Sequence, residues 1–453
     1  MFKKFTNLCV ALVNRWLPDS FLFAIILTFV VFIASVIFTQ QTPLQVLLHW
    51  TGRQGFWSLL AFSMQMAAVL VFGNAMAQAP IFKRFLSKIA KSVKTKEQAI
   101  MMSAFVGAVA CWINWGFGLV IGALLAKEIA KEVKGVDYRL LIASAYSGLL
   151  VWHGGIAASI PLTLASGANL AAATGGAVKA AIPTSETIFS TFNLTLSAML
   201  IIALPLINRA MIPDKEHTIT IDPKLLIEDA PAPEKARKDM TPAEKMENSK
   251  IVWALTLCMG LGYVGYFLYA KGFNLDLNIV NFIFLFVGIL LHGNLKRYID
   301  AIGSAARQAG GIILQFPFYA GIMGMMVGVN PATGLSLAGL ISNMFVGIST
   351  KETFPLWTFL SAGIVNFFVP SGGGQWAVQA PIMMPAGAKL GVSPAITAMA
   401  IAWGDAWTNM IQPFWALPAL GIAGLGAKDI LGYCAIVLIA GGLIICGSFL
   451  FLT

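Results

Sequence analysis

The segment PSGGGQW, from Pro370 to Trp376, decides how the fold is interpreted. It lies inside an apolar run, preceded by TFPLWTFLSAGIVNFFV and followed by AVQAPIMMPAGA. Three consecutive glycines are unfavourable in the interior of a helix or a strand. If the run enters a membrane, irregular backbone is tolerated there only where protein or a water-filled cavity surrounds it. The segment therefore predicts a tip between two helical arms that faces an internal site, although glycines also let helices pack closely.

The composition is that of a membrane protein. The 453 residues are 58% hydrophobic and 11% charged, whereas soluble domains carry about 25% charged residues. Apolar stretches of about 20 residues, long enough to span a bilayer, recur along the chain. We therefore expect an all-α polytopic membrane protein with the lipid bilayer as a partner. The predicted spans are 20–38, 56–79, 139–165, 187–208, 251–270, 276–292, 310–328, 393–418 and 429–451.

The net charge of +10 does not indicate a nucleic acid partner, because nearly all the basic residues lie between the spans. The five cysteines are isolated in apolar segments and form no C-x-x-C pair. Neither a zinc site nor a disulfide framework is therefore expected.

The two halves of the chain resemble each other. The triplet Thr-Lys-Glu at 95–97 recurs at 350–352, and a break in an apolar run follows each copy. The first break is WINWG at 112–116, and the second is PSGGGQW. Farther on, WHGG and WGD interrupt spans. These matches predict two repeats. The repeats are 1–212 and 251–453, with re-entrant helical hairpins at 97–130 and 352–389, broken spans at 139–165 and 393–418, and a polar linker at 213–250.

Parity and charge predict the orientation. Hairpins add no net crossing. The predicted spans between two equivalent spans therefore give an odd number of crossings, and the two repeats have opposite orientations in the membrane. The positive-inside rule then places the N-terminus and the linker in the cytoplasm, at the bacterial inner membrane, with the C-terminus outside. The segment 81–94 has an apolar and a basic face at helical spacing and should lie in the interface, with 335–348 as its counterpart. The only basic residues left outside are Arg53, Lys179, Lys271, Lys351 and Lys389.

Inverted repeats with broken helices at mid-depth are typical of secondary transporters. Helix ends inside the membrane offer free backbone amides and a positive dipole end, and both attract an anion. No arginine is placed at mid-depth by the predicted spans. A small monocarboxylate held by amides and neutral donors therefore fits better than a dianion or trianion.

Four motifs resemble the bacterial short-chain fatty acid transporter family, whose members handle acetoacetate and butyrate-like acids. They are WINWGFG with AKEIAKE, VWHGGIAASIPL, NFFVPSGGGQW and AWGDAWTNMIQPFW, and the resemblance extends over essentially the whole chain. It implies a homodimer whose scaffold and transport domains move as an elevator, within a superfamily that includes sodium-coupled dicarboxylate carriers. Those carriers mark each tip with Ser-Asn-Thr, which this chain lacks, so their sodium sites do not transfer residue by residue.

Candidate site residues lie at the four breaks. Polar side chains at the tips can donate hydrogen bonds, and the tryptophans beside them can form apolar walls for a short alkyl chain. His153 is a candidate for ligand or proton handling, with a structural hydrogen bond as the alternative. The predicted substrate-binding residues are Asn114, Trp115, Gly116, His153, Gly154, Gly155, Ser371, Gly372, Gly373, Gly374, Gln375 and Trp403.

A second group of candidates follows the break in the second half. A buried carboxylate at Asp405 is costly unless it is protonated or paired with a cation. We therefore expect Asp405, Thr408 and Asn409 to couple transport to protons or to a sodium ion, and we expect no other metal and no cofactor. The alternative is that Asp405 caps a half-helix.

Two other functions stay open at this point. One is a carrier or channel for a different organic anion, such as a C4-dicarboxylate. The other is a membrane-embedded enzyme that uses His153 and Asp405 as an acid–base pair. The duplicated tips and the absence of the H-E-x-x-H and G-x-S-x-G motifs argue against an enzyme.

Overall fold

The computed structural model describes residues 2–16, 20–167, 170–222, 239–271, 277–370 and 372–453. Every regular element in these ranges is helical, which confirms the predicted all-α class. Among the described residues, six helical segments are long and apolar enough to cross a membrane. They are Phe21–Thr39, Tyr138–Ser166, Thr191–Ala210, Pro242–Ala270, Gly310–Val327 and Ala427–Phe451.

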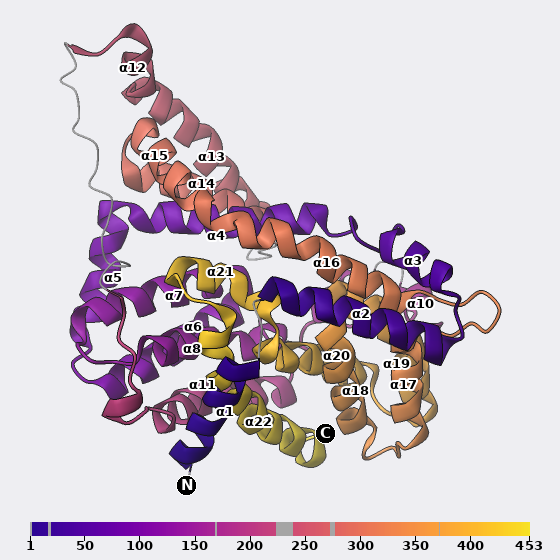
Figure 1. The fold of residues 1–453 in the computed structure, drawn as a ribbon. Coiled ribbons are helices and arrows are strands. Elements are labelled where there is room, and N and C mark those ends of the chain that lie inside the picture. The colour runs from indigo at the N-terminus through magenta and orange to yellow at the C-terminus, as the bar shows by residue number, and fades with distance from the viewer. Residues whose placement is uncertain (1, 17–19, 168–169, 223–238, 272–276, 371) are drawn as a thin grey trace.

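Three long helices run side by side across the view in Figure 1. They are α2 (Ser20–Thr39), α4 (Leu60–Gln78) and α16 (Gly310–Val327). α14 (Leu277–His292) packs along α4, and α3 (Pro43–Thr51) packs against α16. On the outer side of α2, large apolar side chains are exposed, as on a helix whose surroundings are lipid rather than water.

The first helical hairpin follows α5 (Pro80–Ser92) and consists of α6 (Lys96–Ile113) and α7 (Trp115–Glu132). Thr95 begins α6 with a capping box that includes Gln98. The arms meet at Asn114, whose side chain accepts a hydrogen bond of 3.0 Å from the Phe117 backbone N–H. One asparagine therefore ends α6 and caps α7.

The helix after this hairpin is interrupted. α8 (Tyr138–Ser147) tightens into the 3₁₀ helix η1 (Gly148–Gly154), and the chain is helical again in α9 (Ser159–Ser166). Asp137 caps α8 through the Leu140 N–H at 2.8 Å. η1 packs against α6, which brings the interruption next to the first hairpin. α10 (Leu170–Ala173) and α11 (Thr191–Ala210) follow.

The second half contains α17 (Leu337–Gly347) and a second pair of consecutive helices in contact, α18 (Phe354–Phe368) and α19 (Gly372–Lys389), which we call the second hairpin. α20 (Pro394–Thr408) packs along α18 and leads through η6 (Asn409–Ile411) to α21 (Pro413–Ala423).

The interruption between α20 and α21 lies later than the sequence suggests. Trp403, Gly404 and Asp405 are inside α20, and the helix is interrupted from 409 to 412. α18 passes so close to Gly404 that an added Cβ there would lie 2.5 Å from Ala362 Cβ. Close packing between the two helices therefore explains the glycine inside α20. Pro413 has no backbone N–H and begins the next helix at its first position, which suits proline.

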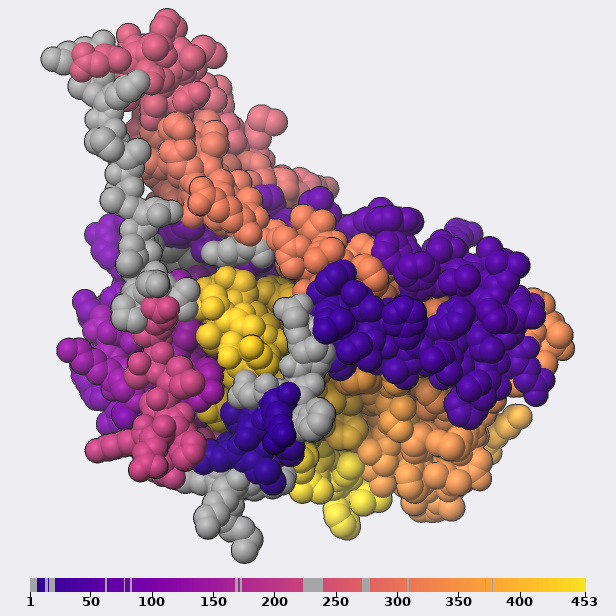
Figure 2. Space-filling model, in the orientation of Figure 1, coloured from indigo at the N-terminus to yellow at the C-terminus, as the bar shows by residue number. Residues whose placement is uncertain are grey.

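The remaining helices lie around this body. α1 (Phe2–Trp16) packs against α22 (Ala427–Phe451). α11 leads to η2 (Lys215–His217). In Figures 1 and 2 the segment that contains α12, α13 and α15 projects from the body, with α14 at its base. The bounds of the other elements are Pro242–Glu247 for α12, Lys250–Lys271 for α13, Leu295–Ala306 for α15 and Arg307–Ala309 for η5.

Candidate functional site

The centre of the molecule holds a hydrogen-bonded imidazole and carboxylate from the two halves of the chain. His153 of η1 and Asp405 of α20 are both fully buried, and the distance from Nδ1 to Oδ2 is 2.8 Å. The Ile160 backbone N–H donates to His153 Nε2 at 3.2 Å. Because Nε2 accepts this bond, the neutral ring carries its proton on Nδ1 and donates it to Asp405.

A serine extends this pair toward the tip of the second hairpin. Ser159 Oγ lies 3.0 Å from His153 Nε2 and is half-buried at the start of α9. Gly372, the first residue of α19, lies directly beside both side chains. An added Cβ on Gly372 would be 2.7 Å from His153 Cε1, and it would be closer still to Ser159 Oγ. The second tip, Ser159, His153 and Asp405 therefore form one continuous row of contacts.

The other side of Asp405 is held by amide side chains. Asn366, in the last turns of α18, donates from Nδ2 to the Asp405 carbonyl oxygen at 2.6 Å. The same Nδ2 lies 2.9 Å from Thr408 Oγ1 and from Asn409 Oδ1. Gln412 in turn donates from Nε2 to the Asn366 carbonyl oxygen.

Three buried oxygens of this group have no hydrogen-bond partner among the described residues. They are Asp405 Oδ1, Asn366 Oδ1 and Gln412 Oε1. A buried acceptor without a partner is unusual and calls for an occupant such as a proton, an ion or water. These oxygens are the ligand type that a hard cation such as sodium prefers. Thr408 and Asn409, which the sequence also proposed for the cation, use Oγ1 and Oδ1 to accept from Asn366.

The first tip is lined by tryptophans. Trp152 stacks on His153 with ring centroids 3.9 Å apart. Trp115, from the start of α7, and Trp415, from α21, lie edge-on to each other at 5.1 Å. Trp152 is 6.0 Å from Trp115 and 5.7 Å from Trp415. Three elements thus build one aromatic wall beside the imidazole.

The glycines after His153 are packed tightly against other elements. An added Cβ on Gly154 would lie 2.5 Å from the ring of Trp403, and Gly155 faces the Trp112 backbone. Trp403 donates from Nε1 to Asn193 Oδ1 at 3.0 Å, and Asn193 donates from Nδ2 to the Gly154 carbonyl oxygen at 2.8 Å. Close packing therefore accounts for the two glycines.

Most of the predicted residues lie in or beside this site, but their burial and their hydrogen-bond partners differ. Asn114 and Gly116 are buried at the first tip, and Asn114 uses its side-chain oxygen as a cap. Gln375 of α19 donates to the Ala362 carbonyl oxygen at 2.9 Å and to Gln379 Oε1 at 2.6 Å, so its amide lies within the hairpin. Gly373 is exposed, and Gly374 is half-buried. Ser371 lies outside the described residues.

Sequence reasoning missed five residues that the structure places here. A lone polar side chain in an apolar span was the available signal for Asn193, Asn366 and Gln412. Ser159 lies six positions after His153, but only the turn between η1 and α9 brings the two together. Trp415 follows Pro413, and its partners lie in the other half of the chain.

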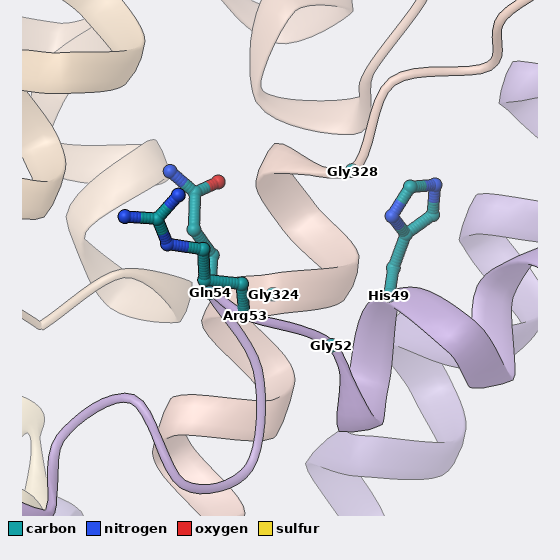
Figure 3. Close-up of a pocket in the computed structure, with 6 residues that line it drawn as sticks. All are labelled: His49, Gly52, Arg53, Gln54, Gly324 and Gly328. Atoms are coloured by element: carbon teal, nitrogen blue, oxygen red, sulfur yellow. The ribbon is translucent and has the colours of Figure 1, made fainter.

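A cavity of about 420 Å³ lies elsewhere, between α3, the loop after it and α16. It is lined by His49, Gly52, Arg53, Gln54, Gly324 and Gly328. Figure 3 shows the side chains of Arg53 and Gln54 together and that of His49 apart from them, beside Gly328. The cavity contains none of the predicted site residues, and its polar groups do not converge.

Comparison with known proteins places the chain in a family. The profile of the family described as "Short chain fatty acid transporter" matches residues 1–452. A protein of Escherichia coli (strain K12), named as a short-chain fatty acid transporter, is 44% identical over 98% of both chains. One of Haemophilus influenzae (strain ATCC 51907 / DSM 11121 / KW20 / Rd), with the same name, is 45% identical over 97% of both.

A solved structure, the Alcanivorax borkumensis YdaH transporter, is also similar at 16% identity. Its TM-score is 0.42, and the match covers 95% of this chain and 98% of that one. The family and its named relatives are transporters and not enzymes. This membrane protein therefore belongs to the short-chain fatty acid transporter family.

Proposed function

We propose that the protein carries short-chain carboxylic acids such as butyrate or acetoacetate across the bacterial inner membrane and couples their movement to a cation. The observation that carries the proposal is the row of contacts from Gly372 through Ser159 and His153 to Asp405. It joins a hairpin tip to a buried carboxylate, so a ligand at the tip can change the environment of Asp405.

The substrate would bind where the row meets the aromatic wall. Its carboxylate is within reach of the Ser159 hydroxyl and the backbone amides at the start of α19, where the helix dipole favours an anion. Its short alkyl chain would contact Trp115, Trp152 and Trp415. A single hydroxyl, neutral amides and a neutral imidazole suit one negative charge better than two or three.

The cation would be held at Asp405. A proton on the carboxylate, or a sodium ion shared with the unpartnered oxygens of Asn366 and Gln412, would compensate the buried charge. Thr408 and Asn409 would keep Asn366 oriented. His153 would fix the carboxylate through its Nδ1–H.

We infer the movement from the packing. α6 and α7 lie against η1, and α18 and α19 lie against α20. The two hairpins and the broken helices would form the transport domain, while α2, α4, α14 and α16 would belong to the scaffold. In this proposal 1–212 and 251–453 are inverted repeats with re-entrant hairpins, the N-terminus is cytoplasmic, and two copies form a homodimer.

The test is counterflow of radiolabelled butyrate in proteoliposomes loaded with unlabelled butyrate. We expect acetate and acetoacetate outside the vesicles to compete, and succinate and citrate not to compete. Equal competition by succinate would indicate a dicarboxylate carrier. Absence of counterflow in vesicles that contain folded protein would contradict the proposal.

A further inference from the structure

α5 presents an exposed face on which apolar and basic side chains lie next to each other. Ile81 and Phe85 have exposed fractions of 54% and 57%. Arg84, Lys88 and Lys91 are also exposed. In a helix, positions 81, 84, 85, 88 and 91 are related by steps of three and four residues and share one side.

The opposite side of α5 is already covered. Leu86, Ala90 and Val93, just after the helix, are 3%, 0% and 4% exposed. α5 packs there against α7 of the first hairpin. In Figure 1, α5 lies at one end of α4 and runs across the direction of the long helices, as a helix in the plane of the interface would. The exposed face is therefore directed away from the protein.

The charge of this face is uncompensated. The sequence of α5, PIFKRFLSKIAKS, has no carboxylate. In the part of the chain that the structure describes, Arg84, Lys88 and Lys91 form no ion pair. Another basic amphipathic helix, α15, differs in this respect. There Lys296 Nζ lies 2.7 Å from Asp300 Oδ1.

We propose that the exposed face of α5 is a binding site for anionic phospholipids. The phosphodiester of the headgroup would accept from Arg84, Lys88 and Lys91, while Ile81 and Phe85 enter the acyl region beside it. Three like charges on one helical face repel one another unless an anion lies between them. A surface that combines cations with exposed apolar side chains fits a lipid headgroup and chain better than an acidic peptide.

The position of α5 gives such lipids a consequence for transport. α5 connects α4 to α6, so it is the link between a long outer helix and the first hairpin. Headgroups bound to α5 would hold this link in the plane of the interface while the hairpin moves.

The test is native mass spectrometry of the purified full chain with titrated phosphatidylglycerol and, separately, phosphatidylcholine. A basic residue near an anionic surface contributes about fivefold in affinity. We expect phosphatidylglycerol to bind at least about tenfold more tightly than phosphatidylcholine, and the triple variant Arg84→Gln/Lys88→Gln/Lys91→Gln to lose this preference.

A matched control removes three basic residues from α15 and η5, as Lys296→Gln/Arg297→Gln/Arg307→Gln. We expect this variant to keep the preference to within about twofold, although its net charge changes equally. The single variant Lys88→Gln, with an expected loss of about fivefold, tests the site if the triple variant is not monodisperse. Equal loss in both triple variants, or no preference in the parent protein, would overturn the proposal.

Discussion

Gly372 lies so close to His153 that an added Cβ would be 2.7 Å from Cε1 of the imidazole. The two residues are 219 positions apart and come from different halves of the chain. The tip of the second hairpin is thereby in contact with the interrupted helix of the first half. Movement of the tip must either carry His153 with it or uncover it.

The contact predicts that an added methyl group is tolerated at some glycines and not at Gly372. Gly372→Ala should abolish butyrate counterflow while the protein stays folded and inserted, because the new methyl group would displace His153 or Ser159. Gly265→Ala in α13 is the control, since an added Cβ there meets no atom within 4 Å and the residue lies outside the proposed binding site. Counterflow and size-exclusion profiles of both variants check this. Normal counterflow by Gly372→Ala would contradict the steric argument.

Sequence reasoning predicted a break at the three glycines, but Gly372, Gly373 and Gly374 form the first turn of α19, and the described non-helical residues, Val369 and Pro370, precede them. The expectation rested on the low helix propensity of three consecutive glycines, which did not prevent them from starting a helix. Which atoms lie beside each glycine depends on how the two halves of the chain pack together, and the local sequence does not show this. Gly404 is a similar case. Its sequence suggested a break, but it lies inside α20, where the absence of a side chain allows α18 to pack closely.

The polar network shows a similar division. His153 and Asp405 could be singled out because ionisable residues in apolar spans are rare. Their mutual hydrogen bond, and the roles of Asn366 and Asn193, depend on how η1, α11, α18 and α20 pack. A lone asparagine in an apolar span was the only signal for these two residues, and neutral amides are too common there for it to assign a role.

A stability prediction follows from the bond between Trp403 and Asn193. Trp403→Phe keeps the ring in place but removes the donor, so the buried Asn193 Oδ1 loses its partner at 3.0 Å. Such a loss costs about 1–3 kcal/mol. We expect a lower unfolding temperature in detergent, measured by thermal scanning. Trp57→Phe, at a residue with 61% exposure, should leave it unchanged, and an equal shift in both would contradict the prediction.

Orientation in the membrane can be tested by labelling. Single cysteines that replace Lys245 and Lys389 in a cysteine-free background should react from opposite sides with an impermeant maleimide. We expect Lys245→Cys to be protected in intact cells and Lys389→Cys to react, because the positive-inside rule predicts a cytoplasmic linker. Labelling of both from outside would contradict the inverted repeats.

The role of Asn366 can be separated from its packing. Its Nδ2 donates to the Asp405 carbonyl oxygen, Thr408 and Asn409. Asn366→Asp keeps the shape but replaces the donor by an acceptor and adds a second carboxylate beside Asp405. We expect loss of gradient-driven uptake. Ser342→Ala removes a buried hydroxyl of α17 that accepts from Gln379 Nε2 at 3.1 Å, and it should retain uptake. Equal losses in the two variants would indicate a packing effect.

Asp405 provides the sharpest test of coupling. An ionised carboxylate at a fully buried position costs several kcal/mol unless a proton or cation compensates it. In the proposed cycle the loaded cation crosses only with substrate. Asp405→Asn keeps an oxygen that accepts from His153 Nδ1–H, so the bond at 2.8 Å and the fold should survive. The variant has no carboxylate to protonate and no negative charge to hold a sodium ion, and we therefore expect it to lose uphill accumulation driven by an ion gradient. Exchange of internal for external butyrate should partly persist, because exchange needs no net cation movement. The structure rules out a capping role, because Asp405 lies inside α20. If Asp405 instead only orients His153 through their hydrogen bond, asparagine should replace it with little loss, since its amide oxygen accepts the same bond. Gradient-driven uptake and exchange measured on the same proteoliposomes separate the two, and normal accumulation by the variant would remove Asp405 from the coupling mechanism.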